Sequence, residues 1–405
     1  MPAPTQTPSP APHVRGGFLL VACQGGAEEA LCSRQQEVLP QVSKGVWRRG
    51  VVTFRLPEAA VDSPDFDPPD DFFPDLTFAR TVIRSLGQAK GSTEPELLDS
   101  LLTLAGNTSW DNVHAWVRAP RGATADEAAA EASGLRATIL KALQARRLLG
   151  RQSLETVIDE PTARPGDLVL DCIIDEQGDN TAQRLWVGWH RAKALPSQWP
   201  GGLYPVGLPD DKVSRAWLKL DEAIHSYAID FRPGSRAVEL GASPGGACQR
   251  LLEAGLEVVG VDPALVDPCV AALPGFTQWR KRARDVPLRD LRGFDWVVSD
   301  MNIDPVSSME SVGRVVTAPG SRVEGIIATL KLPDWSRAAA LDTWLAQFQG
   351  WGFTARARQL STGGREVCVF ARRSGRRRGP AGAGVSQQAR RAPRGGRPAT
   401  RREDR

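Results

Sequence analysis

The sequence predicts an α/β protein whose C-terminal part folds as a doubly wound, mostly parallel sheet behind an N-terminal α+β region. From Asp211 to Arg373, apolar runs typical of strands alternate with helical stretches, which indicates about 160 residues of α/β structure. Before Asp211, strands and helices follow one another in orders typical of small α+β domains. At 405 residues the chain is long enough for two or three domains.

The first 75 residues predict one small domain between two irregular segments. Residues 1–12 are proline-rich and we expect disorder. A β-α-β-β pattern follows in GFLLVAC, AEEALCSRQQEVL and VWRRGVVTFRL. The segment from Pro57 to Asp75 has seven acids and no base, and we interpret it as an irregular linker.

The block 76–200 predicts a second α+β domain. Helical LLDSLLTLAG, strand NVHAWVRA, a long helix and strands DLVLDCIID and RLWVGWHRA suit a small RNA-binding module. Trp186, Trp189 and His190 are candidates for stacking on RNA bases, although large aromatic residues in strands are more often core.

The charge of the chain is unevenly distributed. The net charge is +4, but the tail from Ser374 holds ten arginines and two acids, so residues 1–373 are slightly acidic. This tail has almost no apolar residues to bury, and we expect residues 374–405 to be disordered. It suits contacts with RNA phosphates, and a merely solubilising tail is the alternative.

Two classes of protein are disfavoured. No apolar run approaches the ~20 residues of a membrane span, and we interpret the short run FLLVAC as a buried strand and not a signal peptide. The six cysteines form no C-x-x-C pair, which argues against a zinc knuckle or a disulfide framework and suits a cytoplasmic protein. We therefore expect no metal site and no membrane partner.

A glycine-rich loop in AVELGASPGG follows the first strand of the C-terminal sheet. It lacks G-K-[ST] and does not read G-x-G-x-x-G, so a P-loop and a dinucleotide site are disfavoured. Asp262, 21 residues after Gly241, is placed to bind a ribose diol, and Asp285 is a candidate for adenine. A nucleoside without pyrophosphate, S-adenosylmethionine (SAM), fits both facts. The candidate cofactor residues are Glu239, Gly241, Ala242, Ser243, Pro244, Gly245, Gly246, Asp262, Asp285 and Asp300.

Four charged residues are predicted to meet at one edge of that sheet. Asp300 and Lys331 end two strands, and Glu366 begins a strand that we expect to be antiparallel. Lys219 lies off the apolar stripe of a helix whose buried face holds Trp217. Methyl transfer to a hydroxyl needs its proton removed or the alkoxide stabilised, so Lys331 acts either as a base with a lowered pKa or by its charge.

These residues resemble a known family. Lys219, Asp300, Lys331 and Glu366 match the K-D-K-E tetrad of the FtsJ-like ribose 2′-O-methyltransferases, and LGASPGG resembles their cofactor loop. In order, SRAWLKLDEA, AVELGASPGG, WVVSDM, TLKLP and ARQLSTGGREVCVFARR resemble segments of bacterial enzymes that methylate cytidine ribose in 23S ribosomal RNA.

The resemblance implies a Rossmann-like SAM methyltransferase domain at 201–373, a THUMP-like RNA-binding domain at 76–200 and a ferredoxin-like domain with an acidic linker at 13–75. It also implies 23S rRNA, with domain V as the expected region, as partner of a monomer or weak homodimer.

Three other functions remain open. An amino-group methyltransferase would carry N/D-P-P-Y/F where this chain reads SDMNIDPVSS. A cytosine C5-methyltransferase needs a cysteine near that loop, but Cys269 follows the second strand instead. A non-catalytic RNA-binding or assembly protein would not need all four charged positions filled.

Overall fold

The computed structural model describes residues 16–61, 76–118, 125–150, 154–175, 183–193 and 195–374. The proline-rich start, Asp62–Asp75 of the predicted linker, and the arginine tail from Gly375 lie outside these ranges. The chain divides into two compact units, 1–373 and 374–405. Among the described helices, none combines the length and apolar character that crossing a membrane requires.

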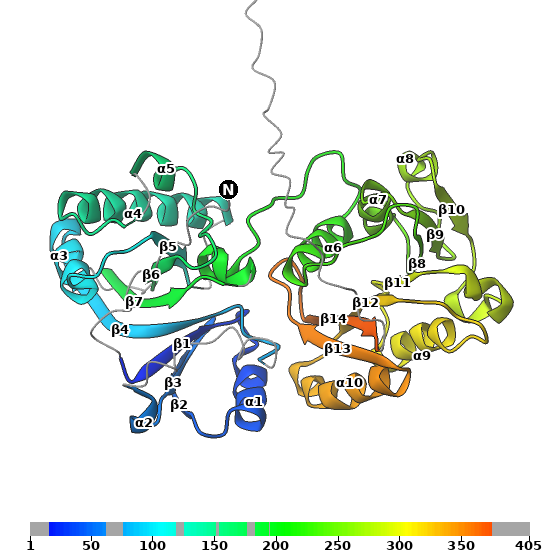
Figure 1. Cartoon of the computed structure of the whole chain (residues 1–405), viewed down its shortest axis with the longest axis horizontal. Helices are drawn as coiled ribbons and strands as arrows, with labels where there is room; N and C mark the ends of the chain where they lie inside the picture. The colour runs from blue at the N-terminus through cyan, green and yellow to red at the C-terminus, as the bar shows by residue number, and fades with distance from the viewer. Residues whose placement is uncertain are drawn as a thin grey trace, which may run out of the picture. The chain divides into compact units, whose positions relative to one another are not determined.

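One seven-stranded sheet forms the core of the N-terminal region (Figure 1). Its order is β2-β3-β1-β4-β7-β6-β5, and only β5 and β6 pair in parallel. The strands are β1 (Phe18–Ala22), β2 (Ser43–Arg48), β3 (Val51–Arg55), β4 (Thr81–Gly91), β5 (Asn112–Val117), β6 (Leu168–Ile174) and β7 (Gln183–Arg191). The predicted ferredoxin-like and THUMP-like segments therefore share a sheet, because β4 pairs with both β1 and β7.

Helices cover this sheet, and three of them, α1, α3 and α4, lie where the sequence predicts them. They are α1 (Glu28–Val38), α2 (Glu58–Val61), α3 (Glu94–Ala105), α4 (Ala125–Ala145) and α5 (Leu154–Ile158). Leu101 of α3 and Ile139 of α4 pack with Leu170 of β6 in one buried cluster. Two 3₁₀ turns, η2 (Leu195–Gln198) and η3 (Pro200–Gly202), follow β7.

One sequence interpretation of this region is wrong, and burial decides between two alternatives that the sequence left open. The segment from Pro57 is not irregular throughout, because Glu58–Val61 forms α2; alanine and glutamate favour a helix, and proline is tolerated before a helix's first turn. Trp186, Trp189 and His190 are 5%, 0% and 3% exposed, so the core placement that the sequence favours is confirmed and they cannot stack on RNA bases in this conformation. Trp189 packs in the cluster with residues of α3 and α4, and Trp186 packs with Trp116 and Ile173 in a separate buried cluster.

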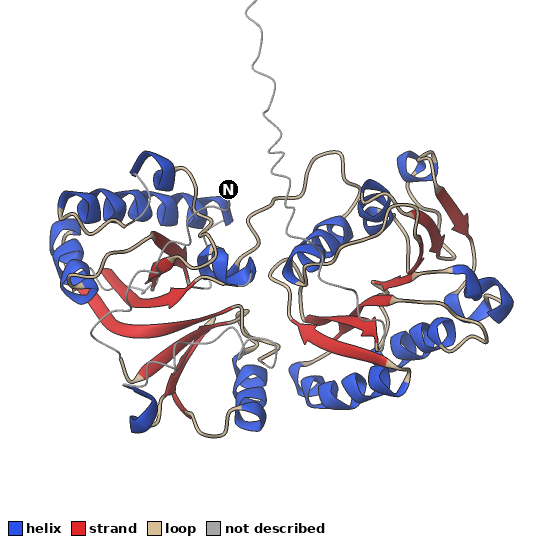
Figure 2. Ribbon diagram, in the orientation of Figure 1, coloured by secondary structure: helices blue, strands red, loops and turns tan. Residues whose placement is uncertain are grey.

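The second sheet has the doubly wound arrangement that the sequence predicts, drawn as red arrows between blue helices in Figure 2. Its order is β10-β9-β8-β11-β12-β14-β13. The strands are β8 (Arg236–Leu240), β9 (Glu257–Val261), β10 (Phe276–Trp279), β11 (Trp296–Ser299), β12 (Gly325–Lys331), β13 (Phe353–Arg358) and β14 (Glu366–Arg373). The first five are parallel, and β14 pairs antiparallel with β12 and β13.

Helices cover both faces of the second sheet. They are α6 (Arg215–Ser226), α7 (Gly246–Glu253), α8 (Pro268–Ala271), α9 (Pro305–Val316) and α10 (Leu341–Gly350), with 3₁₀ turns η4 (Ala283–Asp285), η5 (Leu288–Gly293) and η6 (Trp335–Ala340). Leu220 of α6 and Leu251 of α7 pack on one face, while Val312 of α9 and Phe348 of α10 pack on the other. The predicted apolar stripe of α6 is confirmed, and its burial leaves Lys219 on a different side of the helix.

Candidate active site

Four charged side chains converge at the carboxyl edge of the second sheet. Lys219 comes from the middle of α6, Asp300 follows β11, Lys331 ends β12 and Glu366 begins β14. The antiparallel pairing of β12 with β14 sets Lys331 directly opposite Glu366. The expected orientation of the last strand is therefore confirmed, and it is what brings the start of a strand to the edge where the parallel strands end.

The four groups form a closed ring in which each lysine contacts both carboxylates. The Nζ of Lys331 lies 2.8 Å from Oδ1 of Asp300 and 2.5 Å from Oε2 of Glu366. The Nζ of Lys219 contacts Oδ2 of Asp300 and lies 3.3 Å from Oε1 of Glu366. Positive and negative side chains thus alternate around the ring, and the ring has no formal net charge.

The carboxylates set the protonation state of Lys331. Its side chain is 20% exposed, and burial alone would lower the pKa. The negative charges of Asp300 and Glu366 outweigh that effect, and the pKa is raised above the ordinary lysine value. The sequence left open a base role in which the pKa of Lys331 is lowered, and the structure does not have that lowered pKa. In this conformation Lys331 is a cation at neutral pH, which favours action by charge.

A buried carboxylate that the sequence analysis missed holds the loop before Glu366. Glu222 is 2% exposed and accepts hydrogen bonds from the backbone nitrogens of Ser361 and Thr362, both at 2.8 Å. It also accepts one from the hydroxyl of Thr362 at 2.7 Å. Glu222 lies three residues after Lys219, so one helix presents a lysine to the ring and fixes the loop that leads to Glu366.

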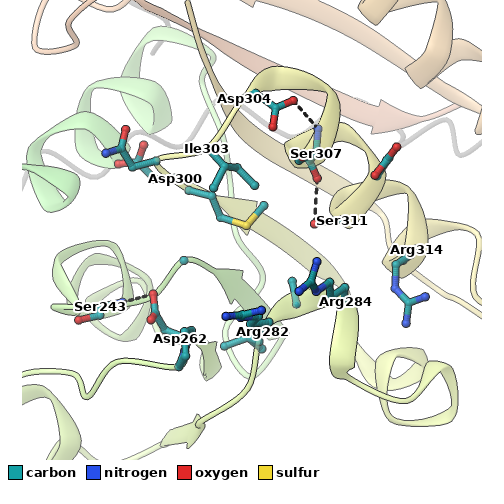
Figure 3. A pocket seen from close by; sticks show the side chains of 17 residues that line it. Ser243, Asp262, Arg282, Arg284, Asp300, Ile303, Asp304, Ser307, Ser311 and Arg314 are labelled. Carbon is teal, nitrogen blue, oxygen red and sulfur yellow. Dashed lines mark hydrogen bonds between the residues drawn. The ribbon is translucent and has the colours of Figure 1, made fainter. Parts of the chain in front are cut away.

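A cavity of about 630 Å³ opens beside the ring (Figure 3). The glycine-rich loop contributes Gly241 and Ser243 to its wall, and Asp262 and Asp300 contribute carboxylates. The remaining lining residues come from the segments after β9, β10 and β11 and from α9: Val261, Pro263, Arg282, Ala283, Arg284, Met301, Asn302, Ile303, Asp304, Ser307, Glu310, Ser311 and Arg314. Asp300 thus belongs to both the cavity and the ring.

The glycines of the loop serve different purposes. Gly241 has a φ of +85°, and a Cβ there would lie 2.7 Å from Cγ and 3.0 Å from Cα of Met301. A side chain at this position would clash with Met301, so glycine lets the loop lie close against the segment after β11. At Gly246 a Cβ would lie 2.8 Å from the carbonyl oxygen of Ser214 and 3.0 Å from the nitrogen of Trp217. This second glycine lets α7 approach α6, and it does not line the cavity.

Asp262 is placed as the sequence predicts, at the end of β9 and in the cavity wall. Its Oδ2 accepts a hydrogen bond from the nitrogen of Ser243 at 3.2 Å, and its Oδ1 accepts one from Ala264 at 2.8 Å. Each oxygen has a second lone pair for a ligand hydroxyl. The backbone bonds fix the carboxylate relative to the glycine-rich loop.

Several predicted cofactor residues do not reach the cavity. Glu239 is 1% exposed beneath the loop, where it accepts a hydrogen bond from the Cys248 thiol at 2.7 Å, and burial raises its pKa to about 8. Asp285 is exposed and lies 3.9 Å from Arg284. Neither lines the cavity, and neither do four loop residues: Ala242, Pro244, Gly245 and Gly246.

Arginines and α9 side chains are the lining residues that the sequence analysis missed. Figure 3 shows Arg282 and Arg284 across the cavity from Ser307 and Ser311. Both arginines belong to the run KRARD, in which the sequence predicts only the acid, Asp285, as a cofactor residue. Nothing in the pattern of α9 distinguishes a residue facing the cavity from one facing solvent.

Comparison with known proteins agrees with this geometry. Residues 212–330 match the model of the FtsJ-like methyltransferase family. This segment is similar to the FtsJ-like methyltransferases over 119 residues. It contains Lys219, Asp300 and the glycine-rich loop, and ends one residue before Lys331.

Curated relatives are named ribosomal RNA large subunit methyltransferase M. The protein of Halorhodospira halophila is 32% identical over 187 residues, which are 45% of this chain and 53% of that one. That of Laribacter hongkongensis is 32% identical over 202 residues, 44% and 54% of the two chains. In both alignments this chain spans about half the length of the relative. A longer match, to Xanthomonas campestris, is 29% identical over 310 residues, 74% of this chain and 83% of that one.

S-adenosylmethionine is the cofactor that the sequence predicts, and the cavity suits it. The volume matches a nucleoside-sized ligand, and Gly241 and Ser243 of the glycine-rich loop line the cavity. Asp262 would hold the ribose hydroxyls, and Asp300 lies where the cavity meets the charged ring. Arg282 and Arg284, and not Asp285, border the part of the cavity beyond β10 that an adenine would occupy.

Replacing Asp262 tests this placement. Asp262→Ala removes a carboxylate acceptor, and we expect SAM affinity to fall roughly 10- to 100-fold, the cost of losing hydrogen bonds to a charged group. Asp285→Ala is the matched control and should leave the affinity within about twofold, since that side chain lies outside the cavity. Isothermal titration calorimetry measures both. Equal losses in the two variants, or tight NAD binding without SAM binding, would contradict the assignment.

Proposed function

We propose that this protein transfers a methyl group from SAM to the ribose 2′-hydroxyl of a cytidine in 23S ribosomal RNA. The observation that carries the proposal is the closed Lys-Asp-Lys-Glu ring at the mouth of the SAM cavity. The printed names of the relatives support the large-subunit RNA as substrate. The cytidine, domain V as the region methylated, an early assembly stage, a cytoplasmic location and a monomer or weak homodimer are part of the proposal.

The ring supplies what methyl transfer to a hydroxyl requires. SAM, when bound, supplies an electrophilic methyl group. Asp300 borders the cavity and holds Lys331 next to it. The Lys331 ammonium donates a hydrogen bond to the 2′-oxygen and stabilises the negative charge that grows there as the hydroxyl proton passes to water. The carbon–sulfur bond of the methyl donor would break as the carbon–oxygen bond forms. Glu366 and Lys219 fix the position of this ammonium and balance its charge.

RNA binding is assigned to other parts of the chain. The body is slightly acidic, so a favourable interaction with RNA phosphates needs local basic segments. The tail from Ser374, with ten arginines, is one such segment. The α+β region 76–200 is the other candidate, by its resemblance to THUMP domains. Its buried aromatic residues mean that contacts there come from its surface.

Two other functions are weaker. Methylation of a different RNA would use the same ring, and only the names of the relatives favour 23S rRNA. A non-catalytic assembly protein would leave the ring without a purpose, since four partly buried charges cost desolvation free energy that a purely structural role recovers better with apolar residues.

Substitution of Lys331 tests the chemistry. Lys331→Ala should lower the single-turnover rate at least about 100-fold, because a positioned acid, base or charged donor contributes on that order. SAM affinity should change little, since Lys331 does not line the cavity. Lys331→Arg should not restore the rate, because a planar guanidinium has a different shape and does not take the position of the ammonium between Asp300 and Glu366.

The assay is single-turnover methylation of a domain V rRNA fragment at saturating RNA, with Lys44→Ala, an exposed residue of β2, as control. Near wild-type turnover in Lys331→Ala would refute the role of the ring. Methylation that fails on the fragment but occurs on another RNA would refute only the substrate.

The pH dependence distinguishes the two roles of Lys331. Because Asp300 and Glu366 raise its pKa, the ammonium is fully charged below the ordinary lysine pKa and loses its proton only as the pH rises through the raised value. If the ammonium acts by charge, the single-turnover rate should stay nearly constant from about pH 7 to about pH 9. A rate that rises about tenfold per pH unit over this range, and does so only when Lys331 is present, would show that Lys331 acts as a base.

The arginine tail is tested through salt dependence. A chain ending at Arg373 should bind the rRNA fragment with a shallower dependence of log affinity on log salt, because the slope falls by about 0.7–0.9 for each phosphate that the protein no longer neutralises. Fluorescence anisotropy over a salt series measures the slopes of the two chains. Identical slopes would remove the tail from the account of RNA binding.

A further inference from the structure

A buried polar cluster lies in the N-terminal sheet, away from the methyltransferase site. It consists of His114 in β5, Asp171 in β6 and His190 in β7, which are neighbouring strands. His114 and Asp171 stand opposite each other in the register. The residues beside them in sequence, such as Val113 and Leu170, belong to the core under α3 and α4, so the cluster faces the other side of the sheet.

These three side chains are fully enclosed. His114 and Asp171 are 0% exposed and His190 is 3% exposed. One ligand atom from each residue lies within 4.8 Å of the other two. Groups of this kind are rarely buried unless each polar atom has a partner.

The tautomer of His190 is fixed by the backbone. Its Nε2 lies 2.7 Å from the carbonyl oxygen of Ser197 in η2, an acceptor only, so Nε2 carries a proton. Its Nδ1 lies 2.5 Å from Oδ2 of Asp171, and one proton shared between these two atoms accounts for the contact. A histidine whose second nitrogen donates to a backbone carbonyl has the arrangement typical of a metal ligand.

His114 is the third member of the cluster, but it makes no hydrogen bond to the other two. Its Nδ1 is 3.9 Å from Oδ1 of Asp171, too far for a hydrogen bond. Over the described residues, neither ring nitrogen of His114 nor Oδ1 of Asp171 makes a hydrogen bond. The backbone carbonyl of Pro161 lies near the ring. A neutral imidazole has one ring nitrogen with a lone pair, and that nitrogen can bind a metal ion.

We propose that His114, Asp171 and His190 bind a divalent transition-metal ion, with Zn²⁺ the best match. Two atoms bound to the same tetrahedral Zn²⁺ lie roughly 3.3 Å apart, given bond lengths of about 2.0–2.2 Å. The 3.9 Å gap between His114 and Asp171 is close to that separation, and the 2.5 Å contact must widen. On binding, the ion replaces the proton shared by Asp171 and His190, and that proton goes to solvent.

The donor set decides the choice of metal. Two imidazoles and one carboxylate suit Zn²⁺ and other first-row divalent ions, and do not suit Ca²⁺ or Mg²⁺, which prefer oxygen ligands. Three protein ligands leave a fourth position for water. Since the cluster is closed to solvent, the ion enters during folding and joins three strands to η2 through the His190–Ser197 bond. The expected role is structural.

A substitution that removes only an unpaired group separates this proposal from a plain hydrogen-bond network. His114→Leu keeps an apolar side chain of similar size in the sheet. In a network without metal it removes a buried group that has no partner, so stability should stay equal or rise. In a metal site it removes a ligand. Thr81→Val in β4 is the matched control, because Thr81 is 1% exposed and its hydroxyl also has no hydrogen-bond partner among the described residues.

The full-length chain and its variants are refolded with Zn²⁺ or with EDTA, freed of unbound metal, and measured for zinc content and melting temperature. We expect about one zinc per chain in the wild type and in Thr81→Val, and less than about one-tenth in His114→Leu and Asp171→Asn. The melting temperature should fall with EDTA only in the two zinc-binding proteins. Co²⁺ in place of Zn²⁺ should give the visible absorption of a tetrahedral site in the wild type and not in His114→Leu.

Two results would overturn the proposal. One is a wild type that refolds without retaining zinc and melts at the same temperature with Zn²⁺ and with EDTA. The other is zinc binding that His114→Leu and Asp171→Asn both leave unchanged, which would place the ion elsewhere. The assay needs no methyl transfer, so its outcome is independent of the proposed function.

Discussion

The alternation of charge among Lys219, Asp300, Lys331 and Glu366 is the constraint on which the methyltransferase domain depends. Each lysine contacts both carboxylates, and the four side chains are 10% to 20% exposed. Removing any one leaves a partly buried charge without compensation, which costs more than the net contribution of the intact pairs. The four charges are therefore stable only when all of them are present, and the fold must bring them together from four distant segments of the chain.

The directions and the register of the strands bring the four charged residues to one edge of the sheet, and few other strand arrangements would do so. Parallel strands bring Asp300 and Lys331 to one edge, and a further parallel strand would bring only its own last residue there. The antiparallel β14 instead brings its first residue, and the pairing places Glu366 against Lys331. A slip of one residue in β14 would turn Glu366 to the other face of the sheet. Glu222 opposes such a slip by fixing Ser361 and Thr362 in the preceding loop.

Much of this arrangement could be predicted because it follows the chain's own periodicities. Strand ends mark the edge of a parallel sheet, so Asp262, Asp300 and Lys331 were predicted from position alone, and the stripe of α6 separated Lys219 from the core. The cavity wall was predicted less well. Glu239 also ends a strand, yet its side chain packs beneath the loop, bonded to Cys248. The position of a residue along its strand predicts that it lies at the edge of the sheet. It does not predict whether the side chain points into the cavity or beneath the loop.

In the N-terminal sheet, too, the sequence does not predict which way some side chains point or which of them meet. Trp186 and Trp189 occur in strands with both faces covered, and a pattern of alternation predicts burial only when one face meets water. His114, Asp171 and His190 lie 76 residues apart from first to last and show no ligand spacing in sequence. Three strands bring them together on one face, as four segments bring together the ring of the other domain. The two clusters differ in how well their polar groups are paired. Every charge in the ring has a counter-charge, whereas His114 has no hydrogen-bond partner in the described part of the chain. A polar group buried at that cost is explained by a ligand more readily than by packing.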